Sequence, residues 1–325
     1  MRCPERCLRI TGRTARATLL TWNRSDPMPI TRETFAAAVA IATVGCGIAM
    51  SAFTPGQNAI FSEAQAYERF MGRWSRNLAP LLVRFAAVRD GDTLLDVGSG
   101  TGALAAALAA AAPAGRVVGI DPAAPYVALA QASHGGVRVR FQVGDAQQMD
   151  FEDAAFDRTL SLLVVNFIPD ADRAVEEMKR VTRRGGTIAA AVWDYGEGME
   201  MLRVFWDEAI AMTPAIDSRD ERHMPFCRRG ELAALWRRHR LLDVVEEGLT
   251  VETRFTSFAD YWAPFLDKQG PAGVYVAALS ERERNQLEGR LRTRLLGKGP
   301  DRAFVLHARA WAVRGIVPSS RGSAR

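Results

Sequence analysis

Glycines that alternate with small polar residues, behind an acidic residue, form the part of this sequence best suited to bind a ligand. The run is Asp96-Val97-Gly98-Ser99-Gly100-Thr101-Gly102, and it joins a β-branched stretch to an Ala-rich stretch. Glycine permits a tight turn and a close approach of the backbone to a ligand, and a helix that begins after the run offers free N–H groups. The same run fits the dinucleotide-binding fingerprint, so alone it does not choose between ligands.

Three acidic residues narrow the choice of ligand. Asp96 lies two residues ahead of Gly98, at an expected strand end where a carboxylate would attract an ammonium group but give nothing to a pyrophosphate. Asp121 ends the next β-branched stretch, where an acid can accept hydrogen bonds from both hydroxyls of a ribose. Asp145 ends a third stretch, where it can accept the exocyclic amine of an adenine while the N–H of Ala146 faces a ring nitrogen. The pattern favours a ligand that carries a cation.

Short β-branched stretches alternate with longer segments of helical period from residue 64 onward. The predicted strands are 93–97, 116–120, 137–143, 157–165 and 187–193, and the predicted helices between them are 103–112, 123–133 and 171–183. Connections of this length require parallel strands with helices on both faces. The sequence therefore predicts an α/β fold built on a doubly wound, Rossmann-like sheet.

The hydrophobic pattern loosens after residue 197. It predicts helices at 198–212, 229–240, 257–268 and 279–296, and strands near 242–255 and 303–314. No internal repeat accompanies them. The chain thus continues past the alternating region with further strands and with helical insertions.

Five motifs in a fixed order resemble the class I S-adenosylmethionine-dependent methyltransferases, in particular the branch that includes the quinone-biosynthesis methyltransferases. They are LLDVGSGTG at 94–102, GIDPA at 119–123, GDAQQMDF at 144–151, FDRTLSLLVVNFIPD at 156–170 and EEMKRVTRRGG at 176–186. The resemblance covers residues 64–195. It implies a seven-stranded sheet with an antiparallel last strand, S-adenosylmethionine as methyl donor, and transfer of its methyl group by in-line displacement.

The resemblance also implies roles for individual residues. The glycine run and Asp96 would hold the methionine part of the donor, Asp121 with Pro122 the ribose, and Asp145 with Ala146 the adenine. Leu162 would border the donor as well. The family often has His-His where Asn166-Phe167 stands, just past the fourth strand. If the aromatic segments described below form an acceptor pocket, Asn166 would orient the polar group of the acceptor near the methyl group. Arg184 replaces a common proline before two glycines.

The helix ahead of the glycine run allows two interpretations. Tyr67, Phe70, Met71 and Trp74 share one helical face, which is typical of core packing. Alternatively this helix closes over the donor, with Tyr67 near the sulfonium and Arg73 near the carboxylate.

Several other candidate residues have structural alternatives. Asp121 could be only a helix N-cap, and Asp145 only a turn residue. His223 could be a general base or a surface histidine without an orienting partner. Cys227 is interpreted as a buried small apolar residue.

Aromatic residues are dense in 193–227 and 255–275, the segments after the fifth and sixth expected strands. Insertions at the carboxyl ends of strands lie above the cofactor crevice, so these segments predict an apolar pocket for a small aromatic or lipophilic acceptor. The alternative is a helical subdomain with its own core. The residues concerned are Trp193, Tyr195, Met199, Phe205, Trp206, Phe226, Trp236, Tyr261, Trp262 and Phe265.

Two rival functions stay open at this point. The glycine fingerprint alone would also suit an NAD(P)-dependent oxidoreductase, and the fold alone would suit a binding protein without catalysis. No metal ligand set is expected, because Cys3, Cys7, Cys46 and Cys227 do not combine with the four scattered histidines at zinc spacing. Nucleic-acid binding is not expected either, since no basic stripe interleaved with aromatics marks the body.

The first 60 residues read as a basic tail outside the fold. Residues 1–34 hold +4 of the net charge of +5, and 35–53 is an apolar, charge-free stretch. That stretch could be a membrane anchor or signal, or translation could begin at Met28 or Met50. We expect a methyltransferase domain at 61–318, with a cofactor half at 61–195 and a substrate cap with the last strands at 196–318, then a frayed tail at 319–325. The expected location is the cytoplasm, with membrane contact only through 35–53.

Overall fold

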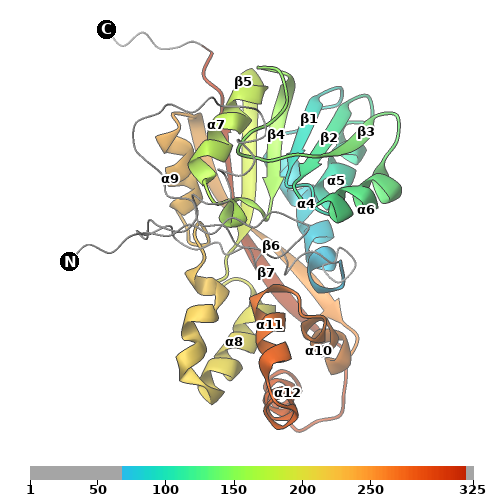
Figure 1. Cartoon of the computed structure of the whole chain (residues 1–325), viewed down its shortest axis with the longest axis vertical. Helices are drawn as coiled ribbons and strands as arrows, with labels where there is room; N and C mark the ends of the chain where they lie inside the picture. The colour runs from blue at the N-terminus through green and yellow to red at the C-terminus, as the bar shows by residue number, and fades with distance from the viewer. Residues whose placement is uncertain (1–67, 320–325) are drawn as a thin grey trace, which may run out of the picture. The chain divides into compact units, whose positions relative to one another are not determined.

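A seven-stranded mixed sheet lies at the centre of the part of the chain that the computed structural model describes, residues 68–319 (Figure 1). Its strand order is β3-β2-β1-β4-β5-β7-β6. The first five strands are parallel, and β7 runs antiparallel to both β5 and β6. The predicted doubly wound sheet with an antiparallel last strand is confirmed. The strands are β1 (Thr93–Val97), β2 (Arg116–Asp121), β3 (Val139–Val143), β4 (Phe156–Leu162), β5 (Thr182–Trp193), β6 (Leu242–Phe255) and β7 (Phe304–Ile316).

Helices cover both faces of this sheet, as its connections require. The chain passes from β1 to β2 to β3 in one direction across the sheet and from β4 to β5 in the other. Because such crossovers are right-handed, the helices of the two halves lie on opposite faces. The reversal between β1 and β4 is the switch point at which α/β sheets bind ligands. These helices are α4 (Arg73–Phe85), α5 (Ala103–Ala111), α6 (Ala124–His134), α7 (Ala171–Val181) and α9 (Glu231–Arg238).

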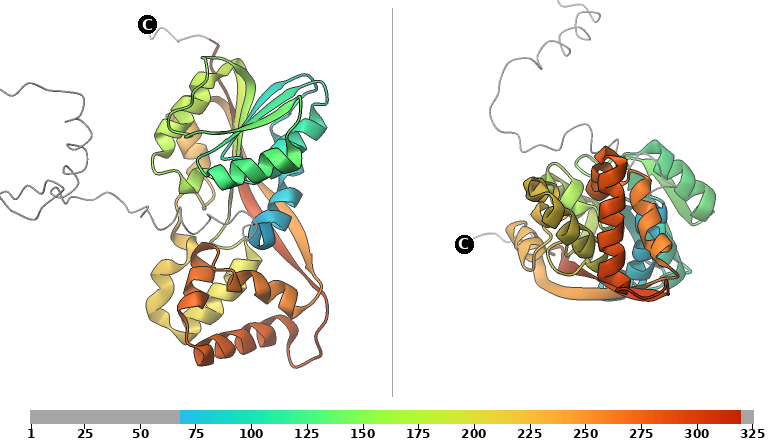
Figure 2. Two further views of the ribbon diagram at one scale, coloured as in Figure 1. Left: turned by 45° about the vertical axis from the view of Figure 1, so that its right-hand side comes forward. Right: turned by 90° about the horizontal axis from the view of Figure 1, so that it is seen from below.

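Long strands β6 and β7 extend beyond the others and carry a helical cap (Figures 1 and 2). Helix α8 packs on β7, α10 packs on β6, and α12 packs on α8. The cap helices are α8 (Glu200–Met212), α10 (Phe258–Leu266), α11 (Gly270–Ala278) and α12 (Glu281–Leu296). Two of them begin at serine caps, since Ser257 accepts from the N–H of Asp260 and Ser280 forms a capping box with Glu283.

Two strands and one helix differ most from the elements predicted by sequence. The strand expected to reach 165 stops at Leu162, because Leu163 has a left-handed backbone (φ +64°) and a 3-10 turn, Val165–Phe167, follows. Strand β5 begins at Thr182 instead of 187, with a register shift opposite Phe156. Helix α11 was not predicted, since its first residues are Gly270 and Pro271.

How deeply a residue is buried depends on where its strand or helix lies in the fold. Every residue of β5 from Gly186 to Trp193 is buried, as expected of a central strand covered on both faces. Within the described residues, no helix is long and apolar enough to cross a membrane. The predictions for 1–60 and for Tyr67 concern residues outside the described range.

Candidate functional site

A cavity opens at the carboxyl ends of β1 and β4, which is the switch point of the sheet. We call it the switch-point cavity. Most of the predicted donor-binding residues meet there, including Asp121, Leu162 and all of the glycine run except Val97 and Gly102. Its lining comprises Ser75, Asp96, Gly98, Ser99, Gly100, Thr101, Ala103, Leu104, Asp121, Tyr126, Leu162, Leu163, Val164 and Phe167.

Asp96 and Ser99 bring polar atoms into this cavity that the protein leaves unpaired. Both carboxyl oxygens of Asp96 and the hydroxyl of Ser99 are buried and have no hydrogen-bond partner among residues 68–319. Burial raises the pKa of Asp96 to about 8; the nearby backbone N–H of Ala105, which is not aligned as a hydrogen bond to either oxygen, lowers it, and the negative charge of Asp121 raises it. An unpaired buried carboxyl group is costly, so its presence indicates a ligand that supplies the missing partner. An ammonium group would do so.

The glycine run needs glycine at particular positions. Gly98 has φ +72°, and a Cβ there would lie 2.4 Å from a methyl carbon of Val164. Gly102 has φ +94°, and its Cβ would lie 2.7 Å from the ring of His134. The N–H groups of Gly98 and Ser99 both donate to the carbonyl of Ile120 at 2.8 Å, which fixes the loop to the end of β2. The turn thus brings bare backbone to the cavity.

Asp121 joins the glycine run to the following helix. Its Oδ2 accepts from the N–H of Gly100 at 3.0 Å, and its Oδ1 accepts from the N–H of Ala123 at 2.9 Å. Burial raises its pKa. The N-cap of α6 is Ala123, so Asp121 is not the cap residue. Each carboxylate oxygen keeps a second lone pair, which leaves room for hydroxyl donors.

Other predicted donor residues lie at or beyond the edge of the cavity. Asp145 is exposed, and its Oδ1 accepts from the backbone N–H of Gln147 at 2.8 Å, as in a side-chain-closed turn. Asp145, Ala146 and Pro122 are not among the residues that line the cavity. All three follow the ends of β3 and β2, next to the switch-point strands.

The helix before the glycine run packs into the core. Phe70, Met71 and Trp74 are buried, which agrees with the packing interpretation of their shared face. The Arg73 guanidinium donates to both oxygens of Asp260 at 2.7 and 3.3 Å and lies over the ring of Phe255. It therefore joins α4 to the cap and does not line the switch-point cavity.

Glu68 is a contact of the glycine run that sequence reasoning missed. Its carboxylate accepts from the hydroxyl of Thr101 and pairs with Arg76. Glu68 lies 33 residues before Thr101 and follows no motif, so only the fold shows this contact. Ser75 and Tyr126, which line the cavity, were missed for the same reason.

A second cavity adjoins the first, and we call it the aromatic chamber. It shares Leu163 and Phe167 with the switch-point cavity, and Trp193 and Tyr195 of the predicted acceptor pocket line it. Its full lining is Phe70, Met71, Leu163, Phe167, Trp193, Tyr195, Leu202, Glu221, Met224, Gly270 and Pro271.

Most of the other aromatic residues expected in the acceptor pocket pack within the helices of the cap. Phe205 stacks on Phe265 at 4.6 Å between ring centres, and Trp206 lies edge-on to Phe205. The Tyr261 hydroxyl donates to the carbonyl of Met201 at 3.0 Å. Trp236 packs outside the cap and donates to the carbonyl of Ile188 at 3.2 Å.

Asn166 is buried beside the chamber and does not line it. Its amide nitrogen lies 3.5 Å from the sulfur of Met224, and its Oδ1 is buried without a hydrogen-bond partner in the described part of the chain. The unpaired oxygen leaves Asn166 able to accept one more hydrogen bond.

The carboxyl group of the chamber belongs to Glu221, which sequence reasoning overlooked in favour of its neighbour His223. The ring of His223 is half-exposed and lies 3.2 Å from Asp217, outside the chamber lining. Cys227 is buried, donates to the carbonyl of Met224 at 2.9 Å, and has its pKa raised to about 11 by burial. It is a packing residue, as interpreted from the sequence.

Comparisons with known proteins agree with this site. Residues 95–190 match the family described as Methyltransferase domain. A demethylmenaquinone methyltransferase of Thermus thermophilus is 36% identical over 118 residues, which are 36% of this chain and 52% of that protein. An uncharacterized protein of Mycobacterium tuberculosis is 36% identical over 118 residues, 36% of this chain and 42% of that protein. The chain therefore spans about half the length of the curated relatives it matches.

A solved structure shares the fold. Phosphoethanolamine N-methyltransferase 2 of Haemonchus contortus, in complex with S-adenosyl-L-methionine, superimposes with a TM-score of 0.51 at 19% identity, covering 84% of this chain and 61% of that chain. With the strand order, the glycine run and the family match, this defines a class I methyltransferase fold. Residues 95–190 thus match a methyltransferase domain, and two relatives of the chain are named demethylmenaquinone methyltransferase.

Proposed function

We propose that this protein binds S-adenosylmethionine in the switch-point cavity and transfers its methyl group to a small aromatic or lipophilic acceptor. The observation that carries the proposal is the pair of buried, unpartnered polar groups of Asp96 and Ser99 beside the glycine run. A dinucleotide would place a pyrophosphate at this turn, where the Asp96 carboxylate would oppose it. The ammonium group of a methionine moiety is the partner that this carboxylate lacks.

Named residues would hold the donor as follows. Asp96 and Ser99 would bind the methionine part, and Asp121 would accept from the ribose hydroxyls through its remaining lone pairs. Leu162 would contact the donor from the end of β4. We assign Asp145 and Ala146 to the adenine, since they follow the end of β3 next to β2.

When bound, the donor supplies an electrophilic methyl group on a sulfonium sulfur. The chain's own task is then to align an acceptor with that group and to exclude water. Leu163 and Phe167 belong to both cavities, so an acceptor in the aromatic chamber would lie next to the donor. Trp193 and Tyr195 would give the acceptor an apolar, aromatic surface.

The relatives support an aromatic acceptor. The Thermus thermophilus protein is named for methylation of demethylmenaquinone, a ring compound with a lipid tail, and it matches this chain over 118 residues. We therefore favour an acceptor with a quinol-like or phenol-like ring.

A labelled-donor assay tests the proposal. The protein is incubated with S-adenosylmethionine carrying a labelled methyl group and an extract of small molecules, and products are separated by chromatography. We expect label in a lipophilic aromatic product, reduced at least about tenfold by Trp193→Ala. Label that stays on the donor, or binding of NADH in its place by calorimetry, would favour a binding protein or an oxidoreductase instead.

A further inference from the structure

Glu221 places one carboxyl group in an otherwise uncharged chamber. Its side chain is buried, with 3% of the residue exposed. The other residues that line the aromatic chamber are apolar or aromatic, and Tyr195 is the single one among them with an ionisable side chain. Burying an acid among apolar side chains costs free energy, so its presence here indicates a function.

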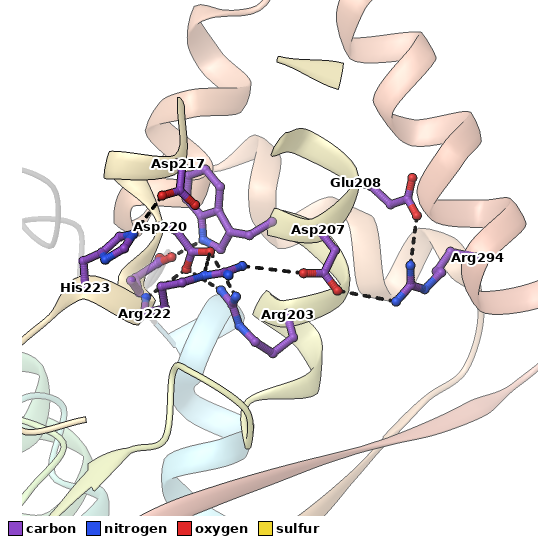
Figure 3. Close-up of polar contacts among 10 residues, drawn as sticks. Arg203, Asp207, Glu208, Asp217, Asp220, Arg222, His223 and Arg294 are labelled. Atoms are coloured by element: carbon purple, nitrogen blue, oxygen red, sulfur yellow. Dashed lines mark hydrogen bonds and ion pairs between the residues drawn. The ribbon is translucent and has the colours of Figure 1, made fainter. Parts of the chain in front are cut away.

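Neighbouring arginines do not neutralise Glu221, because Asp220 engages them. Arg203 donates to Asp220 Oδ2 at 3.0 Å, and Arg222 donates to Asp220 through its backbone at 2.8 Å and its Nε at 2.5 Å. Figure 3 shows these side chains converging on Asp220, with Asp207 next to Arg222. None of the ion pairs within residues 68–319 includes Glu221.

One hydrogen bond fixes the position of Glu221. The indole N–H of Trp206, on α8, donates to its Oε2. Trp206 is itself fully buried among Phe205 and Tyr275. The carboxyl group is therefore held by a rigid aromatic partner at the wall of the chamber.

The Glu221 carboxyl group changes its charge near neutral pH. Its pKa is raised to about 7, chiefly by burial and less by the negative charge of Asp220, against the lowering effects of its own backbone N–H, the Trp206 hydrogen bond and the charge of Arg203. The remaining lining side chains come from the helical turn Glu68–Gly72, the turn after β4, the end of β5, α8, Met224 and α11, and they bring no charge. A group with such a pKa accepts protons efficiently at neutral pH.

From this placement we propose that Glu221 takes the proton from a substrate that carries a hydroxyl group on an aromatic ring and receives the methyl group on that oxygen. This inference rests on the proposed function and adds the class of substrate and the base. As the acceptor oxygen forms its bond to the methyl carbon, its proton passes to the Glu221 carboxylate. The methyl–sulfur bond breaks, its electron pair stays on sulfur, and the sulfonium becomes a neutral thioether. Glu221 then returns the proton to solvent.

The small size of the chamber determines which compounds can be used to test the proposal. Its cavity volume is about 30 Å³, far below the roughly 150 Å³ of an apolar cavity that holds benzene, so a ring enters only as side chains repack. Met71 and Met224 line the chamber, and methionine adapts its shape readily. Single-ring compounds are therefore the right probes: 4-fluorophenol, which has the hydroxyl, and 4-fluoroanisole, which carries a methyl group in its place.

Binding of the two probes is measured by fluorine NMR with the full chain saturated with S-adenosylhomocysteine. We expect 4-fluorophenol to bind about tenfold more tightly at about pH 8 than at about pH 6, because the ionised carboxylate is the stronger acceptor of its O–H. The affinity of 4-fluoroanisole should not change with pH. Glu221→Gln should remove the pH dependence for 4-fluorophenol, while keeping an oxygen for Trp206.

Glu208→Gln is the matched control, since Glu208 is on α8, pairs with Arg290 and Arg294, and does not line the chamber. It should keep the full pH dependence. The proposal is overturned if 4-fluorophenol fails to bind, if both probes bind alike, or if Glu221→Gln retains the pH dependence. Failure of S-adenosylhomocysteine itself to bind would instead refute the proposed function, so the two failures are distinguishable.

Discussion

The carboxylate of Asp121 accepts a hydrogen bond from the backbone N–H of Gly100 at 3.0 Å. The acid assigned to the ribose and the loop assigned to the methionine part are thus one hydrogen-bonded unit. Because the same carboxylate also accepts from Ala123, it ties the carboxyl end of β2 to the start of α6. Disturbing Asp121 should therefore affect both the ligand and the loop.

Replacing Asp121 by alanine should weaken the binding of S-adenosylhomocysteine by about 1.5–3 kcal/mol, through loss of charge-assisted hydrogen bonds to the ribose. The melting temperature should fall slightly, since the N–H of Gly100 loses its acceptor. Calorimetry and thermal melting measure the two effects. Asp150→Ala, at an exposed acid past the third strand, is the control and should bind normally. Unchanged affinity in a folded Asp121→Ala protein would remove Asp121 from the site.

Replacing Asp96 by asparagine should change both the pH dependence of stability and the affinity for the donor. The pKa of Asp96 rises from 3.8 to about 8 on folding, so between these values the folded chain keeps a proton that the unfolded chain releases. Stability of the ligand-free protein should therefore fall as the pH rises through this window. Asp96→Asn should melt at a temperature less dependent on pH, and should bind S-adenosylhomocysteine poorly. Equal pH dependence in both proteins would contradict the burial argument.

Alanine at Gly98 should lower the stability of the protein more than alanine at Gly100. Gly98→Ala would place its Cβ 2.4 Å from Val164, whereas a Cβ on Gly100 meets nothing within 4 Å, and both have positive φ. We expect Gly100→Ala to lose about 1 kcal/mol of stability and Gly98→Ala about 2 kcal/mol or more, with donor binding abolished in the latter. Denaturant titrations give both values. A Gly98→Ala protein as stable as Gly100→Ala would mean that the loop relaxes around the clash.

Arg73→Ala should weaken the contact between α4 and the cap and leave donor binding unchanged. Its guanidinium is held by Asp260, which is 187 residues away, and the pKa of Asp260 is lowered by this contact. The pair is partly exposed, so we expect a loss of about 1 kcal/mol or less. Affinity for S-adenosylhomocysteine should stay within about threefold of wild type, which calorimetry can decide. A larger loss of affinity would place Arg73 at the donor after all.

Deleting residues 1–49 should leave a protein that binds S-adenosylhomocysteine, because every residue that lines the switch-point cavity lies between 75 and 167. Size-exclusion chromatography and calorimetry would show this. An insoluble or non-binding truncated chain would make the tail part of the fold.

The fold and the residues that meet in the switch-point cavity were accessible to sequence reasoning because both depend on local patterns. Strand β1 with its glycine run, and Asp121 at the end of β2, combine burial, turn chemistry and spacing within a few residues. Asp96 could be assigned because a carboxylate ahead of the loop discriminates between ligands whatever the tertiary packing.

The acceptor side could not be predicted in the same way. Glu221 and His223 look equally plausible in the sequence, and only the fold buries the first and exposes the second. The pairing of Arg73 with Asp260 joins residues from opposite ends of the domain. Aromatic density predicted a pocket at Trp193 and Tyr195, but the stacked Phe205 and Phe265 are packing.

Calorimetric titration of the full chain with S-adenosylhomocysteine decides whether the switch-point cavity holds the methyl donor. We predict one molecule bound per chain, in competition with S-adenosylmethionine, no comparable binding of NADH, and loss of binding in Asp96→Asn but not in Asp150→Ala. Absence of S-adenosylhomocysteine binding, or the same affinity in Asp96→Asn as in wild type, would contradict the assignment of the switch-point cavity to the methyl donor.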